Sequence, residues 1–335
     1  MANANYQLVD KITFYPSAIL NAYVTGRLAM VTSIPSGFDG QELSRQDMLS
    51  LITLNPVKTQ KLIPDAVDSE FVFRGADNLC YTDFFMVLNH DFKTSGQYID
   101  IQADTISLQL TNKVNDCFTS APSFDGWSLS TLETAQMIDL TQIVFKGANE
   151  CNIGSILWGK SFTVGQNVDV NQTLDIKYGN KLTKSVGGTT FSKLNYGQTQ
   201  KWNWLDAWEL GDSENPSAGA SRNGIRTWSV NFSLLQDSKM MPQNAMLNSN
   251  GWTQDSNAEY SLAADGTSSS TDANTSDDFY NRVIKMTMGS HLPLVVNISE
   301  STNPDQWAVV RISDYKITQS NPKFVNYKLV LEEQI

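Results

Sequence analysis

The stretch GSILWGKS, residues 154–161, fits the phosphate-binding pattern G-x-x-x-x-G-K-[ST]. In a nucleotide site this pattern follows a strand and opens a helix, so that backbone N–H groups and the lysine surround the phosphates. Here Ile156, Leu157 and Trp158 stand between the glycines, and such large apolar side chains favour a core. The alternating sequence FTVGQNVDV follows where a helix would be needed. We therefore predict that Gly154–Ser161 is a chance match that lies in a strand and binds no nucleotide.

Other residue types that could do chemistry do not form a recognisable pattern. The two histidines, His90 and His291, are not part of a His-Glu-x-x-His pair, and no Gly-x-Ser-x-Gly elbow occurs. The acidic pairs Asp277/Asp278 and Glu332/Glu333 fit a helix start and a chain end better than an acid–base pair. Three widely spaced cysteines suit neither a zinc site nor a disulfide framework. We expect no enzyme activity, no metal and no cofactor.

Length and charge limit the domain organisation and the partners. The chain has 335 residues, of which 41% are hydrophobic, and single cores stop growing at about 250–300 residues, so we expect two domains. The formal net charge of −11 repels phosphate backbones and anionic lipid. No segment approaches the ~18 apolar residues of a membrane span. We expect neither nucleic acid nor a membrane as partner, and a chain made in the cytosol.

The elements that would position any site are mostly strands. Apolar and polar residues alternate, as in strands with one buried face, in the segments 98–110, 160–179, 226–235, 307–317 and 324–333. Clusters of Gly, Asn, Asp and Ser separate these segments and supply turns. The sequence therefore predicts a mainly β protein.

Two segments favour helices. The first begins at Ser44 and covers residues 44–53, a segment that fits equally a loop with a short helical turn. The second covers 276–289, with Ser276 or Asp277 as its cap and Gly289 as its end. Before it, residues 253–278 are poor in large apolar side chains, and they lack the Gly and Glu spacing of an EF-hand, so we expect a long polar loop.

Two further segments resemble a known module. The segment CYTDFFMVLNHDFKTSGQYIDIQ, residues 80–102, resembles a strand–turn–strand of the galactose-binding-like jelly rolls attached to tail proteins of tailed bacteriophages, with Asn89-His90 where the relatives have His-Asn. Residues 152–164, NIGSILWGKSFTV, are similar to the run that closes this module. The resemblance implies a jelly-roll β-sandwich over residues 1–164.

The second half of the chain carries a related resemblance. The order of the segments resembles that in the C-terminal β domain of such proteins and in distal tail proteins. These segments are residues 173–192, an aromatic-rich segment, a helix and the terminal YKLVLEEQI. This implies a second antiparallel β domain over residues 165–335, with one short helix. It also implies a virion protein at the tail tip, baseplate or tail adaptor, synthesised in the host cytoplasm. Such a protein forms a ring of identical subunits and contacts other tail proteins. Trp202, Trp204 and Trp208 are the candidate assembly interface.

Two other function classes stay open. A carbohydrate-binding module would recognise a host-surface glycan through an aromatic platform and polar groups, and its candidate residues are Tyr81, Asp83, His90, Asp91 and Trp127. These residues could instead close a turn or pack over a strand edge. A glycoside hydrolase is the third hypothesis, because its two carboxylates need not be close in sequence.

Overall fold

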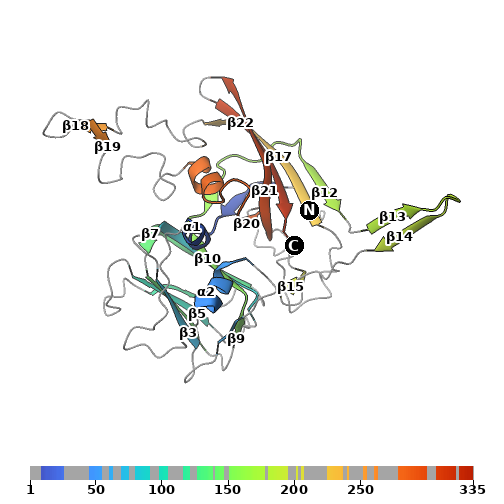
Figure 1. Ribbon diagram of the computed structural model, residues 1–335. Helices are drawn as coiled ribbons and strands as arrows, with labels where there is room; N and C mark the ends of the chain where they lie inside the picture. The colour runs from blue at the N-terminus through green and yellow to red at the C-terminus, as the bar shows by residue number, and fades with distance from the viewer. Residues whose placement is uncertain are drawn as a thin grey trace, which may run out of the picture.

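The computed structural model describes residues 9–25, 45–54, 60–62, 69–74, 80–90, 98–104, 116–120, 127–138, 140–146, 151–177, 180–194, 201–202, 205–206, 225–236, 240, 252–254, 260–262, 278–299, 307–321 and 324–334. These residues form antiparallel sheets with three short helices between them (Figure 1). The predicted mainly β fold is confirmed. Most of the predicted polar loop 253–278 lies outside the described residues, apart from short pieces at 253–254, 260–262 and 278.

The largest sheet has seven antiparallel strands in the order β11-β1-β20-β21-β22-β17-β12. Its strands are β1 (Thr13–Tyr15), β11 (Phe162–Thr163), β12 (Thr173–Lys177), β17 (Ile225–Gln236), β20 (Leu294–Asn297), β21 (Trp307–Asn321) and β22 (Phe324–Glu333). The alternation in residues 226–235 and 324–333 therefore predicted two of its central strands correctly, because one face of each is buried.

Two smaller sheets come from the N-terminal half of the chain. The three-stranded sheet has the order β10-β4-β7, with β4 (Cys80–Leu88), β7 (Trp127–Ile138) and β10 (Ser155–Gly159). The four-stranded sheet has the order β3-β8-β5-β6, with β3 (Ser69–Arg74), β5 (Tyr98–Asp104), β6 (Asp116–Ser120) and β8 (Leu140–Lys146). The remaining strands form pairs: β2 (Gln60–Leu62) with β9 (Cys151–Ile153), β13 (Asn180–Lys184) with β14 (Thr190–Leu194), β15 (Lys201–Trp202) with β16 (Leu205–Asp206), and β18 (Trp252–Gln254) with β19 (Tyr260–Leu262).

The large sheet takes strands from both of the segments that we expected to be separate domains. Thr13 of β1 pairs with Thr163 of β11 on one side and with Asn297 of β20 on the other. Strand β1 therefore joins the N-terminal end of the chain to the C-terminal strands. A boundary between residues 164 and 165 does not separate the sheets, because strands from before it complete the sheet that follows it.

One end of the large sheet is buried on both faces. On one face Phe14, Val296 and Val310 belong to the main core, together with Phe279 and Val283 from the helical segment beside the sheet. Neighbouring residues on the strands point the opposite way. On that second face Tyr15, Val295, Trp307 and Val309 pack against the three-stranded sheet, through Phe84, Met86, Leu88, Trp127 and Leu157. The large sheet therefore lies between a helical turn and the N-terminal strands.

A helix that we did not predict follows β1. Helix α1 (Ala18–Val24) is capped by Ser17, whose hydroxyl accepts a hydrogen bond from the Leu20 N–H at 3.2 Å. The Asn21 side chain donates to the Met286 carbonyl at 2.9 Å, which ties the helix to the C-terminal half. Its seven residues are too few to show a helical period, so a tertiary contact stabilises what the sequence alone does not reveal.

The two predicted helices are present with changed bounds. Helix α2 (Arg45–Ile52) lies within the predicted segment 44–53. The second, η2 (Tyr280–Lys285), is a short π-helical turn, and its first turn is capped by Asp278, whose carboxylate accepts from the Asn281 N–H at 2.9 Å. Ser276 and Asp277, the predicted caps, lie outside the described residues. Gly289, with a φ of 73°, ends the turn as predicted.

A buried ion pair fastens the C-terminal strand to its neighbour. Arg226 of β17 and Glu333 of β22 are both buried and form a salt bridge, and the Arg226 backbone N–H donates to Glu333 Oε2 at 2.7 Å. The Arg226 guanidinium also lies 4.7 Å from the ring centre of Trp228. The carboxylate thus satisfies both a backbone and a side-chain donor at one end of the core.

We predict that Glu333→Gln lowers the free energy of unfolding by about 3 kcal/mol, because it leaves the buried Arg226 charge without its counter-ion. Urea denaturation of the two proteins measures the difference. The matched control is Glu332→Gln, one residue earlier and half-buried. We expect it to change stability by less than about 0.5 kcal/mol. Equal losses for the two variants would contradict the role given to the ion pair.

Candidate functional site

The stretch that resembles a phosphate loop is a buried strand. Ser155–Gly159 forms β10, which pairs with β4 and is buried along its length. The two glycines have packing reasons. A Cβ on Gly154 would lie 2.6 Å from the Cβ of Asn89, and one on Gly159 would lie 2.6 Å from the Pro16 carbonyl oxygen. The prediction that this stretch lies in a strand is confirmed.

Asp83, a candidate glycan residue, is held by the residue that ends this stretch. Its Oδ1 accepts from the Ser161 N–H at 2.7 Å, and its Oδ2 accepts from the Ser161 hydroxyl at 3.0 Å. Asp83 lies on β4 and Ser161 lies just before β11, so the contact fixes the three-stranded sheet to the large one. The carboxylate is half-buried and both of its oxygens are engaged.

The environment of Asp83 alters two ionisation equilibria. Burial raises the pKa of the Asp83 carboxyl above its usual range, while the hydrogen bonds from Ser161 and the charges of Lys160 and Arg282 act in the opposite direction. Burial, together with the nearby negative charge of Asp83, raises the pKa of the Tyr15 hydroxyl to about 12. A raised carboxyl pKa between two sheets makes this contact sensitive to pH.

His90, a second candidate glycan residue, is part of the core. It is buried, and its Nε2 atom is hydrogen-bonded to the Ser128 hydroxyl at 2.8 Å. The preceding residue, Asn89, adopts a φ of 55° at the end of β4. This geometry matches the turn-closing role that the sequence left open for this position.

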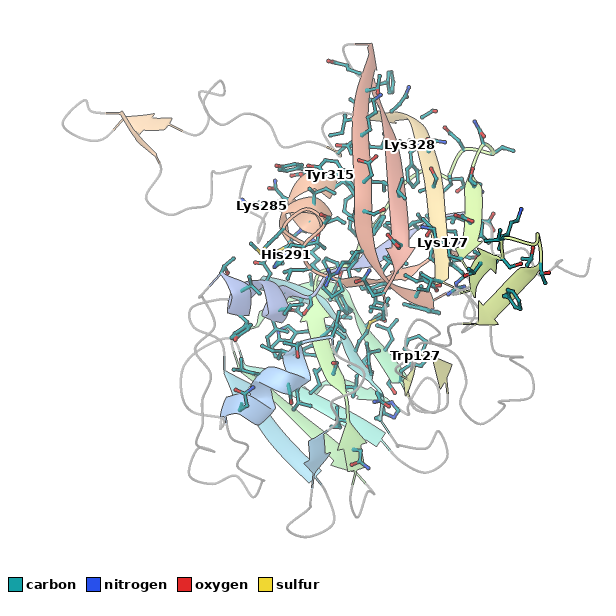
Figure 2. All side chains as sticks on the ribbon, turned by 45° about the vertical axis from the view of Figure 1, so that its right-hand side comes forward. Trp127, Lys177, Lys285, His291, Tyr315 and Lys328 are labelled. Atoms are coloured by element: carbon teal, nitrogen blue, oxygen red, sulfur yellow. The ribbon has the colours of Figure 1, made fainter. Side chains whose placement is uncertain are left out.

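Trp127, the candidate aromatic platform, is packed against other rings. Its side chain is only 2% exposed, and its ring centroid lies 5.1 Å from that of Trp307. Trp307 in turn lies 5.2 Å from Tyr15, which lies 5.0 Å from Phe84. Figure 2 shows Trp127 where the N-terminal strands meet the large sheet. The indole therefore offers no open face on which a sugar ring could stack.

The other candidate residues lie wholly or partly outside the described residues. Tyr81 lies on β4, but its side chain is outside the described set, and Asp91 lies outside the described residues. Trp202 lies on β15, where its backbone pairs with Leu205, whereas Trp204 and Trp208 fall outside the described residues. The proposed roles of these residues in glycan binding and in assembly stay predictions.

A projecting hairpin that we did not single out from the sequence carries several exposed side chains. Strands β13 and β14 follow directly after the edge strand β12 and extend away from the large sheet (Figure 1). We call residues 180–194 the arm. Its tip is closed by backbone hydrogen bonds from Ser185 to Thr189 at 2.9 Å and from Gly188 to Ser185 at 3.0 Å, and Gly188 supplies the φ of 83° that this turn needs.

The arm exposes apolar side chains. Val186 at the tip is fully exposed, and Phe191 on β14 is 60% exposed. Between Thr183 and Phe191 every residue is exposed except Ser185, which is half-buried. Beside the arm, Ile176 on β12 and Val170 before it are also exposed. Apolar side chains are thus exposed before β12, on β12 and on the arm.

The described residues contain neither a candidate metal-binding cluster nor a membrane-spanning helix. Among them no group of three or more His, Cys, Asp or Glu is placed to hold a metal ion. None of their helices is long and apolar enough to cross a membrane.

No protein-family model matches this chain, and no curated protein matches it. Among solved structures it is similar to CBM32-1 from a family 31 glycoside hydrolase from Clostridium perfringens. The likeness covers 40% of this chain and 97% of that chain, at 14% sequence identity and a TM-score of 0.28. A structural likeness with so low a TM-score does not indicate a function. No match supports the resemblance to phage tail proteins, which stays a hypothesis.

The raised pKa of Asp83 predicts a specific pH dependence of stability. Because the folded pKa lies above the unfolded value, the folded state binds this proton more tightly. The stabilisation is complete below the usual pKa of 3.8 and is lost as the pH rises through the folded pKa. We expect the free energy of unfolding of the wild type, relative to Asp83→Asn, to fall over that interval. Urea titrations at a series of pH values measure the difference.

A second variant tests the cause. Ser161→Ala removes the side-chain hydrogen bond that lowers the Asp83 pKa. It should therefore move the pH-dependent loss to higher pH, while the direction of the loss stays the same. A stability difference between the wild type and Asp83→Asn that is constant with pH, or that rises with pH, would refute this account.

Proposed function

We propose that this chain is a structural, non-catalytic virion protein of a tailed phage, which acts by assembling with copies of itself and with other tail proteins. The observation that carries the proposal is the arm, a hairpin that leaves the body of the protein and exposes Val186 and Phe191. The resemblance of the sequence to tail proteins supplies the kind of assembly and its place at the tail tip, baseplate or adaptor.

The physical argument concerns the stability of the arm. A two-stranded hairpin without further support is marginally stable in water, because it buries too little apolar surface to offset its ordering entropy. The described side chains of the arm belong to none of the core clusters. A protein partner that covers Val186 and Phe191 would supply the missing burial. An assembling subunit has such a partner.

The sheet edge next to the arm supports the same function. Strand β12 is an edge strand of the large sheet. All of its residues are exposed except Leu174, which is half-buried. Edge strands offer backbone N–H and C=O groups to a strand from another chain. Monomeric proteins usually protect their edge strands from such pairing. An exposed edge that continues into an exposed arm is suited to contact between subunits.

Carbohydrate binding is the second hypothesis. Among its five candidate residues, Asp83 and His90 are engaged by Ser161 and Ser128, and Trp127 is in the core. A sugar site would therefore have to use other residues of the N-terminal half, such as Tyr81 and Asp91. A panel of host-surface glycans, titrated against the purified protein, tests this function separately from assembly.

We predict that the protein forms a discrete oligomer and that replacing residues 180–194 with a short Gly-Ser linker yields a monomer. The reason is that the linker removes the exposed apolar contact surface without removing any residue of the described cores. Light scattering after size-exclusion chromatography measures the mass of each protein. Thermal unfolding of the variant should still be cooperative, which would show that its body remains folded.

The control is Val24→Ser, which removes an exposed apolar side chain on α1, away from the arm. This variant should keep the mass of the wild type. A wild type that stays monomeric at high concentration would overturn the proposed function. An oligomer that survives loss of the arm would show that assembly uses another surface.

A further inference from the structure

The charges of this protein are unevenly distributed along the chain. Residues 176–205, which contain the arm, hold five of the 24 Lys and Arg residues and none of the 35 Asp and Glu residues. The five lysines are Lys177, Lys181, Lys184, Lys193 and Lys201. The formal net charge of −11 conceals this separation, because the rest of the chain has a large excess of acids. The arm is therefore a cationic extension of an anionic body.

The register of the arm places two of its lysines directly opposite each other. Lys181 of β13 pairs directly with Lys193 of β14, and Lys184 pairs with Thr190 nearer the tip. Like charges at directly opposite positions of a strand pair are unfavourable. Lys184 is exposed, and so is Lys177 at the end of β12, where the arm leaves the sheet (Figure 2). A surface that carries carboxylates would relieve this repulsion, whereas dissolved salt only screens it.

We propose that the arm docks, through its lysines, on an acidic surface of a second copy of this chain. The inference rests on the proposed function and names the partner and the chemistry of the contact. The second copy is the occupant because the arm and the remainder of the chain are complementary in charge. Attraction between them aligns subunits arm to body, which is a heterologous contact of the kind that closes rings.

The composition of the arm favours a protein surface over nucleic acid. A phosphate backbone would attract the lysines, but it would leave Val186 and Phe191 in water. The arm contains no arginine, the residue that most often reads base edges. The acidic body of the protein would also repel a polyanion as it approached. A carboxylate-rich protein surface with apolar contacts satisfies both features of the arm.

The test is a triple charge reversal in the full chain, with Lys181, Lys184 and Lys193 each changed to Glu. Sedimentation velocity measures self-association over about 50 to 500 mM NaCl, a range that shortens the Debye length severalfold. We expect wild-type association to weaken at least about tenfold over this range, since the contact is between opposite charges. The triple variant should associate at least about tenfold more weakly at low salt and depend little on salt.

The matched control reverses three exposed cations outside the arm, Arg311, Lys316 and Lys328 on β21 and β22. It changes the net charge by the same amount and should associate more tightly than the arm variant at low salt, where the electrostatic contact is least screened. Circular dichroism and thermal unfolding confirm that both variants fold. Equal weakening of the two variants would attribute the effect to net charge and overturn the inference.

Two further outcomes separate this inference from the proposed function. A wild-type oligomer that is insensitive both to salt and to the arm charges would overturn the electrostatic docking and leave assembly intact. A wild type that is monomeric at every salt concentration would overturn both. Binding of the wild type to a DNA duplex that is lost in the arm variant, with self-association unchanged, would assign the lysines to nucleic acid and also overturn the inference.

Discussion

The structure depends on the aromatic contact between the large sheet and the N-terminal strands. Trp307 and Tyr15 come from the large sheet, and Trp127 and Phe84 come from the three-stranded sheet. Their ring centroids lie 5.0 to 5.2 Å apart in a connected series. Aromatic pairs prefer particular ring geometries in addition to burying apolar surface. They therefore fix the relative orientation of the two sheets as well as holding them together. The two halves of the chain thus share a core.

The three residues of β1 show how closely the two halves are joined. Phe14 faces the main core, where its ring lies 5.5 Å from Phe279, while Tyr15 faces the aromatic contact. The β1 end of the large sheet is therefore covered on both faces and held rigid. At the opposite edge, β12 and the arm are exposed. A sheet that is held at its β1 end can present its exposed β12 edge to a partner in a fixed direction.

Sequence alone was informative where one face of an element is buried. The alternation in residues 226–235 and 324–333 predicted β17 and β22, whereas β1 and β20 are covered on both faces and show no alternation. The candidate site was harder to predict. The burial of Trp127 depends on Trp307, which is distant in sequence, and no local signal reveals such a partner. The lysines of the arm can be read from the sequence, but the negative net charge of the whole chain does not indicate that they are clustered.

The lysines of the arm also help to keep a protein with an exposed apolar hairpin soluble. A bare apolar edge recruits any available strand and leads to aggregation, and natural proteins counter this by placing lysine on exposed edges. In the free subunit the like charges of two arms repel each other, so arm-to-arm pairing is disfavoured. An acidic surface removes that repulsion and allows Val186 and Phe191 to be buried. In the proposed docking, one set of charges would both oppose indiscriminate association and select the partner.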